Sequence, residues 1–298
     1  MTILKFIKHL FDYLLYYPIY LLKTKDKYNI ISEEETVNLL VSKKKSLSRF
    51  GDGEFKWLLN IHQKSFQKQN EKLMMRLREI LMSDNKNVII AIPDSINYLD
   101  NHTFDSKRYW AKFYSKYLNK IRKYLNFNYA YSNANISRPY MCYKNKDENI
   151  MRHKFDNIKK IWNKKDILIV EGELTKLGVG NDLFENANSI KRIICPNCNA
   201  FDIYDDILSV TKKYGKNKVI LIALGPTATV LSYDLGVDNY QAIDIGHTDI
   251  EYMWYINKSY KKVAVNGKFV NEAQTSNFVI SSDMNSYHYE KQIIYKFN

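Results

Sequence analysis

Short apolar runs alternate with amphipathic stretches along most of this 298-residue chain. The runs predict strands at residues 46–50, 88–93, 167–170, 190–194, 219–224 and 240–244. Apolar positions at helical spacing predict helices at residues 74–82, 108–125, 200–214 and 226–235. Strands that alternate with helices are typical of a parallel sheet covered on both faces. We therefore predict an α/β, Rossmann-like fold with a mostly parallel sheet.

Residues at the ends of these segments support the predicted boundaries. Ser32 with Glu35 forms a capping-box pattern, which indicates a helix start. Gly215 and Gly236 are predicted to follow helix ends, where a glycine relieves backbone strain. Tyr109 in the 108–125 helix is interpreted as a core residue. No Pro- or Gly-rich linker interrupts residues 31–298, which we take as one domain after a helical segment at residues 1–30.

The first 24 residues are rich in leucine and aromatic side chains, interrupted by Lys5, Lys8, Asp12 and Pro18. The segment is too polar and broken to span a membrane, and it lacks the small-residue cleavage site of a signal peptide. Lysines among apolar residues suit a helix that lies in a membrane interface. The same pattern suits a helix packed on the protein's own core or on a second subunit. Both interpretations stay open.

The formal net charge of +13 favours anionic partners such as phosphorylated substrates or anionic lipid. Its lysines are dispersed, and the chain carries no nucleic-acid-binding motif, so we expect no nucleic-acid partner. Three cysteines do not make a disulfide framework, and they fit a reducing, cytoplasmic compartment.

Gly51-Asp52-Gly53-Glu54 follows the first predicted strand and opens a helix. Glycine permits positive φ and a close approach of a ligand to the backbone. Two carboxylates on such a turn can ligate a hard divalent cation, which usually keeps substrate phosphates among its other ligands. The turn therefore indicates a metal–diphosphate site at Asp52 and Glu54.

Three further segments lie at predicted strand ends, where doubly wound sheets bind ligands. The loop after residue 170 offers Lys176 for phosphate charge, with Gly180, Asn181 and Asp182 for close or polar contacts. It has neither Walker nor G-x-G-x-x-G spacing, which argues against a dinucleotide-dependent oxidoreductase.

The segment Gly225-Pro226-Thr227 follows another strand and opens a helix, whose free N–H groups and dipole attract phosphate. The last segment places His247, Asp249 and Glu251 at alternating positions. If this stretch is extended, all three side chains face one side. Together they would form a metal site or supply a general base for a hydroxyl nucleophile.

These segments resemble the GT-D glycosyltransferase family, a bacterial domain family, over roughly Ser46 to Tyr255. The matching motifs are residues 49–54, 178–184, 192–196 with 199–201, 224–228, and 244–247 with 249–252 and 254. The resemblance implies a UDP-sugar donor and a manganese-type ion (Mn²⁺ or Mg²⁺) at a D-x-E motif, which Asp52 and Glu54 match. It assigns Glu54 to the metal and Asp52 to the metal or the nucleoside ribose.

The family's late motif often reads glutamate-tyrosine-glutamate-tryptophan, whereas this chain has Glu251-Tyr252-Met253-Trp254. If the second glutamate is the family's catalytic base, Met253 does not replace it. Glu251, Asp249 and His247 remain as candidate bases.

The sequence thus predicts a metal-dependent transferase that moves a sugar, with glucose expected, from a UDP-sugar to a hydroxyl. Arg49, Lys176 and the helix start at Gly225 add positive potential for the donor. The expected acceptor is a surface glycan, a glycoprotein or a lipid-linked sugar at the inner face of the cell membrane, with peripheral contact through residues 1–24. The alternative is a non-catalytic membrane-surface or scaffold protein that retains the fold. A phosphotransferase is a third option.

Overall fold

A computed structural model describes residues 3–62, 67–268 and 284–297. Within them, nine strands form one sheet in the order β1-β4-β3-β2-β8-β7-β5-β6-β9, and every pair of neighbours is parallel. The strands are β1 (Ile30–Ile31), β2 (Ser46–Arg49), β3 (Val88–Ile92), β4 (Tyr131–Asn133), β5 (Asp166–Gly172), β6 (Ser189–Cys195), β7 (Val219–Ala223), β8 (Gln241–Asp244) and β9 (Ile293–Lys296). The predicted parallel, Rossmann-like sheet is confirmed.

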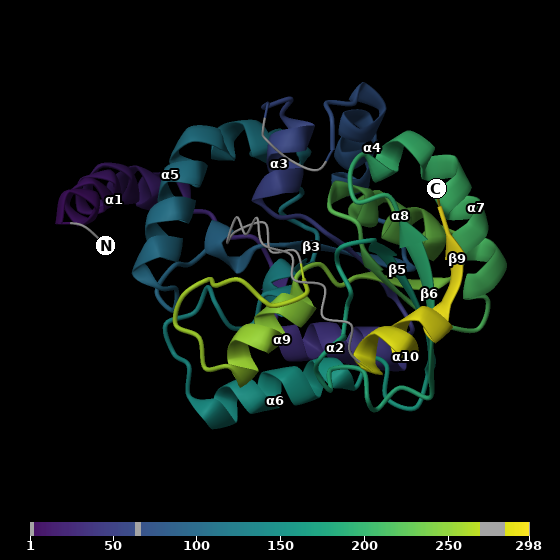
Figure 1. Cartoon of the computed structure of the whole chain (residues 1–298). Coiled ribbons are helices and arrows are strands. Elements are labelled where there is room, and N and C mark those ends of the chain that lie inside the picture. The colour runs from purple at the N-terminus through teal and green to yellow at the C-terminus, as the bar shows by residue number, and fades with distance from the viewer. Residues whose placement is uncertain (1–2, 63–66, 269–283, 298) are drawn as a thin grey trace.

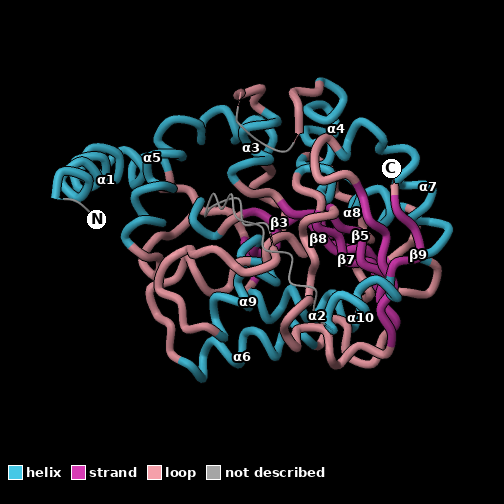
Figure 2. Tube along the Cα trace, in the orientation of Figure 1, coloured by secondary structure: helices cyan, strands magenta, loops and turns pink. Residues whose placement is uncertain are grey.

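Helices cover both faces of this sheet (Figures 1 and 2). The first face carries α3 (Asp52–Leu58), α4 (Glu71–Leu81), α5 (Phe104–Ile121), α7 (Tyr204–Gly215) and α8 (Pro226–Val237). The second carries α2 (Glu33–Ser42), α6 (Glu148–Lys159) and α9 (Thr248–Ile256). Near the C-terminus, α10 (Met284–Gln292) leads into β9.

Strand β7 shows how the sequence divides the core between the two faces. Ile220 and Ile222 join the core of the first face, and Val219 and Leu221 join that of the second. This alternation follows from the two-residue period of a strand. All of these side chains are buried, which explains why the strand reads as a continuous apolar run.

The N-terminal helix α1 (Ile3–Lys23) packs against α5, on the side away from the sheet (Figure 1). It continues through Pro18. The predicted domain boundary after residue 30 falls within β1, and Tyr20 and Tyr28 are buried in the same core as α5. Within the described residues, we find no helix that combines the length and apolar character needed to cross a bilayer.

Two glycines that were expected just beyond helix ends lie within the helices instead. Gly215 is the last residue of α7, and Gly236 precedes the last residue of α8. A Cβ on Gly215 would meet Ile220 Cδ1 at 2.6 Å. A Cβ on Gly236 would meet Val88 Cγ2 at 2.6 Å and Ser46 Cβ at 2.7 Å. Close packing of helix on strand, and not a left-handed backbone, therefore explains both glycines.

Replacing Gly236 with alanine should lower the free energy of unfolding by about 1–3 kcal/mol, because the added methyl group overpacks the contact between α8 and the strands. Urea unfolding measures the change. Gly53→Ala is the matched control. A Cβ there meets nothing within 4 Å, and alanine is favoured over glycine inside a helix. A Gly236→Ala variant as stable as wild type would contradict the packing explanation.

Candidate functional site

Strands β2 and β8 lie side by side, with Leu47 opposite Ile243, but the chain leaves them toward opposite faces. After β2 it enters α3, which packs on the first face, and after β8 it enters α9, which packs on the second. Figure 1 shows α3 above the sheet and α9 below it. Such a divergence at the carboxyl ends of neighbouring strands is the switch point at which doubly wound sheets bind ligands.

Arg49 ends β2 and Asp244 ends β8, so the two strands bring opposite charges together at this point. Arg49 Nη2 lies 3.6 Å from Asp244 Oδ1, and both side chains are largely buried. Among the described residues, Arg49 Nε and Asp244 Oδ1 are buried without a hydrogen-bond partner. Gly246, with φ of +51°, leaves room for this arginine, since a Cβ there would lie 2.1 Å from Arg49 Nη2.

The Asp244 carboxyl group titrates unusually. Burial raises its pKa to about 6, the Arg49 charge opposes the rise, and the nearby Glu54 carboxylate adds to it. Buried polar atoms in proteins are usually hydrogen-bonded. The buried atoms of the Arg49–Asp244 pair that lack a partner therefore indicate a place where a polar ligand can bind.

The acidic turn forms the first turn of α3, as predicted. Glu54 Oε2 accepts a hydrogen bond from the Gly51 amide at 2.8 Å. Asp52 Oδ2 accepts from Lys56 Nζ at 2.6 Å and from the Tyr109 hydroxyl. Burial alone would raise the pKa of Asp52, but the Lys56 charge and these hydrogen bonds outweigh it and lower the pKa.

Tyr109 is not the core residue that its helical spacing suggested. It is 39% exposed, and its hydroxyl reaches across from α5 to Asp52. Lys56 Nζ also lies 3.0 Å from this hydroxyl. The i,i+4 spacing of Asp52 and Lys56 predicts their contact on one helix face. The approach of α5 could not be predicted from the sequence.

Asp52 and Glu54 fit a cation as part of a ligand set. Across residues 3–62, 67–268 and 284–297, no three His, Cys, Asp or Glu side chains converge into a complete metal site. Two carboxylates completed by substrate phosphates and water are the usual arrangement for a magnesium-type ion. Lys56 and Tyr109 both bind Oδ2 of Asp52, so a cation at that atom would displace one of them.

The segment with His247, Asp249 and Glu251 is not extended. It forms α9, with His247 as the N-cap residue. Successive residues of a helix are rotated by about 100°, so Asp249 and Glu251 point in different directions. The expectation that all three side chains face one side is therefore wrong, because the buried Tyr252 and Trp254 draw the segment onto the second face as a helix.

Asp249 and Glu251 are each about 1% exposed and hold neighbouring loops. Asp249 Oδ1 accepts from the Gly178 amide at 2.9 Å and from Asn181 Nδ2 at 2.7 Å, and Oδ2 pairs with Lys268. Glu251 Oε2 accepts from the amides of Tyr140 and Met141, at 3.0 and 2.7 Å.

Burial raises the pKa of Glu251, and the Arg138 charge opposes that rise. Met253, at the position of the family's second glutamate, is partly buried against the core of the second face. It contributes packing there and no polar group.

The loop after β5 is anchored from beneath by a buried ion pair. Arg192 Nη1 lies 2.6 Å from Glu171 Oε1, and Glu171 Oε2 accepts from the Leu177 amide at 2.7 Å. Two predicted donor-binding residues of this loop contact α6 and α9. Asn181 binds Asp249, and Asp182 pairs with Lys159 at 3.0 Å and accepts from the Tyr252 hydroxyl at 2.6 Å. Lys176 is half-buried and Gly180 is exposed, both with positive φ.

At the start of α8, Gly225 is exposed with φ of +54°, and Pro226 occupies the first helical position, as predicted. Thr227 is fully buried, and in the described structure its hydroxyl has no hydrogen-bond partner. A phosphate at this helix start would therefore meet the backbone of Gly225 before the Thr227 hydroxyl.

Arg138 was missed by the sequence analysis. It follows the short helix after β4, and its Nη2 lies 3.0 Å from His247 Nδ1. Since a guanidinium only donates, Nδ1 accepts and the ring proton of the neutral histidine lies on Nε2. The charge of Arg138 also lowers the pKa of Asp52, so it acts on both sides of the switch point. Ser137-Arg138-Pro139 has no motif that could have revealed this.

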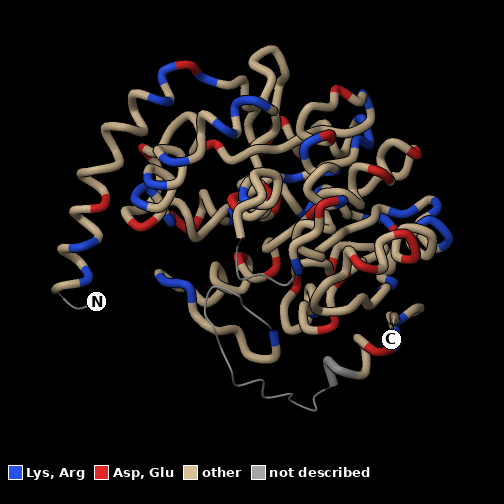
Figure 3. Tube along the Cα trace, turned by 90° about the horizontal axis from the view of Figure 1, so that it is seen from above, with Lys and Arg blue, Asp and Glu red and all other residues tan. Residues whose placement is uncertain are grey.

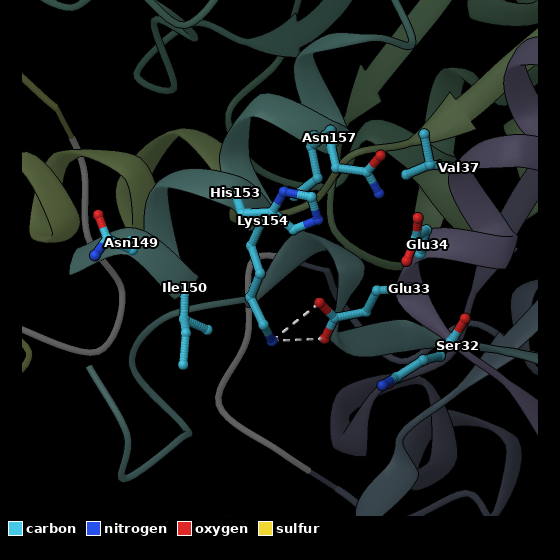
Figure 4. A pocket seen from close by; sticks show the side chains of 11 residues that line it. Ser32, Glu33, Glu34, Val37, Asn149, Ile150, His153, Lys154 and Asn157 are labelled. Atoms are coloured by element: carbon cyan, nitrogen blue, oxygen red, sulfur yellow. Dashed lines mark hydrogen bonds and ion pairs between the residues drawn. The ribbon is translucent and has the colours of Figure 1, made fainter. Parts of the chain in front are cut away.

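A separate pocket of about 580 Å³ lies between α2 and α6. Its side chains include Glu33 and Lys154, which form an ion pair of 3.0 Å (Figure 4). The Tyr143 hydroxyl links Glu33, at 3.2 Å, to Asp94, at 2.9 Å. Burial raises the pKa of Glu33, while Lys154 opposes the rise. None of the site residues expected from the sequence lines this pocket.

Known proteins resemble this chain in sequence and in structure. A family model for the glycosyltransferase GT-D fold matches residues 47–273. The glycosyltransferase GlyD of Streptococcus pneumoniae is 36% identical over 222 residues, which make up 74% of this chain and 27% of the relative. A probable glycosyl transferase, Gly, of Streptococcus gordonii is 36% identical over 247 residues, 82% of this chain and 35% of the relative. The chain therefore spans only about a third of the length of these curated relatives.

Solved structures cover nearly the whole chain. A domain of unknown function 1792, described as having a distinct glycosyltransferase fold, matches with a TM-score of 0.86 and 34% identity, covering 94% of this chain and 98% of its own. A structure described as a new glycosyltransferase from Streptococcus sanguinis matches with a TM-score of 0.84 and 32% identity, covering 91% and 100%.

The raised pKa of Asp244 makes stability depend on pH. A folded pKa of about 6 lies above the unfolded value, so the stabilising contribution is full below pH 4 and is lost as the pH rises through 6. Asp244→Asn removes this titration. The free energy of unfolding of wild type minus that of the variant should fall by about 2 kcal/mol between pH 4 and 7. Urea unfolding in metal-free buffer measures it, and a difference that is constant with pH would contradict the shift.

Proposed function

Because this chain belongs to the glycosyltransferase GT-D fold family, we propose that it transfers a sugar from a UDP-sugar to an acceptor hydroxyl. Glucose is the proposed sugar, and a surface glycan, glycoprotein or lipid-linked sugar is the proposed acceptor. The observation that carries the proposal is the switch point between β2 and β8. Two helix starts, an acidic turn and the buried Arg49–Asp244 pair meet there.

We propose that the donor diphosphate lies between the start of α8 and Arg138. The exposed backbone of Gly225 and the dipole of α8 favour an anion. Arg138 supplies a planar, permanently charged guanidinium that suits phosphate. The ring proton of neutral His247 lies on Nε2, because Nδ1 accepts from Arg138.

Asp52 and Glu54 are the proposed holders of a divalent cation, Mn²⁺ or Mg²⁺. A bound cation there would stabilise the charge that develops on the leaving UDP. Without a cation, the charge of Lys56 balances that of Asp52 and helps to lower its pKa. The Asp52 carboxylate therefore stays ionised and able to bind a metal ion. This partial neutralisation also lowers the repulsion between Asp52 and an incoming diphosphate.

Glu251 is the proposed proton acceptor for the hydroxyl nucleophile. Its raised pKa brings its proton affinity closer to neutral pH, as a general base requires. The amides of Tyr140 and Met141 hold its orientation. Asp249 is saturated by Gly178, Asn181 and Lys268, so we assign it a positioning role. The lone pair on His247 Nδ1 already accepts from Arg138, so we do not assign the base role to His247.

The double substitution Asp52→Asn with Glu54→Gln should abolish manganese-dependent release of UDP from UDP-glucose, because two carboxylate ligands become neutral amides. An assay for free UDP measures this. Glu34→Gln with Glu35→Gln, on the exposed side of α2, is the matched control and should keep full activity.

A thermal melt should show that the double variant is folded, since the carbonyl oxygen of glutamine at position 54 still accepts the hydrogen bond from the Gly51 amide. UDP-glucose is expected to release UDP faster than UDP-galactose or UDP-N-acetylglucosamine. Full activity in a folded Asp52→Asn, Glu54→Gln variant would reject the proposed metal site.

Arg138→Ala should weaken UDP binding at least about tenfold, because a charge-assisted hydrogen bond to phosphate is lost. Calorimetric titration with UDP and Mn²⁺ measures the dissociation constant. Arg138→Lys should recover part of the affinity, since lysine keeps the charge but not the planar fork.

Arg152→Ala, on the exposed side of α6, is the control and should bind UDP as wild type does. If Arg138→Ala also binds UDP with unchanged affinity, Arg138 does not contact the donor diphosphate.

A further inference from the structure

Helix α1 presents a broad apolar surface to solvent. Ten of its large apolar side chains are exposed, including Leu4 at 82%, Phe11 at 67% and Leu14 at 62%. The ten are Leu4, Phe6, Ile7, Leu10, Phe11, Leu14, Leu15, Ile19, Leu21 and Leu22. We call this set the α1 apolar face. A contiguous apolar surface of this kind on a soluble protein usually marks an interaction site.

Contacts on the opposite side of α1 hold this face outward. Asp12 pairs with Lys112 at 3.0 Å and with Arg108 at 3.7 Å, both on α5. The Tyr20 hydroxyl donates to the Ser95 carbonyl at 3.0 Å, and Ser115 Oγ donates to the Tyr16 carbonyl at 2.8 Å. These buried or half-buried contacts fix the orientation of α1, so its apolar face is held toward solvent.

The charges on α1 indicate what covers this face. Asp12 is the only acidic residue of α1, and Arg108 and Lys112 of α5 balance its charge. Lys5 and Lys8 are exposed near the N-terminal end, where Figure 3 shows blue segments along the helix. A second copy of the chain would bring like charges together in a two-fold contact, within a protein of net charge +13. An anionic surface has the complementary charge.

We propose that the α1 apolar face inserts into the headgroup region of an anionic lipid bilayer, with the helix parallel to the membrane plane. The helix is roughly 30 Å long and apolar on its outward side, as interfacial helices are. Lysines near its N-terminal end add electrostatic attraction to anionic headgroups.

This placement links the membrane to the candidate active site. Helix α5 binds Asp12 of α1 through Arg108 and Lys112, and it reaches Asp52 through the neighbouring Tyr109. A bilayer beneath α1 therefore lies about two helix diameters, roughly 20 Å, from the acidic turn. This inference rests on the proposed function. It favours a lipid-linked acceptor, whose sugar would project from the bilayer toward the acidic turn.

Flotation of the full chain with vesicles tests the proposal. Wild type should float with vesicles of phosphatidylcholine and phosphatidylglycerol in equal parts, and only weakly with phosphatidylcholine alone. Phe11→Ser with Leu14→Ser should lower partitioning at least about tenfold, because two inserted side chains are lost. Lys5→Glu with Lys8→Glu should lower it by a similar factor on the anionic vesicles.

Met75→Ser with Met82→Ser is the matched control, since both methionines are 56% exposed outside α1. This variant should float as wild type does. Wild type that stays unbound, that binds both vesicle types equally, or that binds unchanged after Phe11→Ser with Leu14→Ser would overturn the proposal. So would light scattering that shows a dimer converted to monomer by that variant without vesicle binding.

Release of UDP in solution separates this inference from the proposed function. The α1 variants should release UDP from UDP-glucose at the wild-type rate, because none of them alters the switch point. Normal UDP release without flotation rejects the membrane contact alone. Flotation without any UDP release from wild type rejects the proposed function alone.

Discussion

The parallel pairing of β2 with β8 is the contact on which the candidate site depends, because it joins segments almost 200 residues apart. The Ser46 hydroxyl donates to the Tyr240 carbonyl at 2.8 Å and accepts from the Ala242 amide at 2.9 Å. The Thr229 hydroxyl donates to the Arg49 carbonyl at 2.9 Å, which ties α8 to the end of β2. With these bonds in place, the chain can leave the two strands toward opposite faces, and Arg49 and Asp244 meet at the point of divergence.

Buried charges around this point divide into two groups. Glu171 with Arg192, and Asp249 with Lys268, are ion pairs that fix the loop after β5 and the start of α9. Removing one partner of such a pair leaves an uncompensated buried charge and is strongly destabilising. Asp244 and Arg49 are buried as well, but their 3.6 Å separation leaves polar atoms without partners. The two tight ion pairs hold the loop and the helix start in place, whereas the Arg49–Asp244 pair keeps polar atoms that can hydrogen-bond a ligand.

Helix α5 connects the candidate site to the outer surface of the molecule. Tyr109 extends from it toward Asp52, and Arg108 and Lys112 bind Asp12 of α1. One helix thus supports both the acidic turn and the apolar face of α1. For the lipid-linked acceptor proposed above, this connection would hold the acceptor hydroxyl at a constant distance from the donor.

Local pattern determined much of the fold. The apolar runs predicted six strands, the Ser32 side chain caps α2 by accepting from the Glu35 amide, and Pro226 begins α8. These features depend on neighbours within one turn or one strand, so the sequence alone displays them. The acidic turn at Asp52 and Glu54 was also legible, since its glycines and carboxylates are adjacent in the chain.

Only the tertiary structure decided which side chains converge. Asp249 and Glu251 point apart because packing onto the second face makes their segment a helix, although their spacing also suited a strand. Arg138 reaches His247 across 109 residues, and Tyr109 reaches Asp52 across 57. Such contacts cannot be predicted from local sequence, because they depend on the strand order and on which helix packs against which face of the sheet.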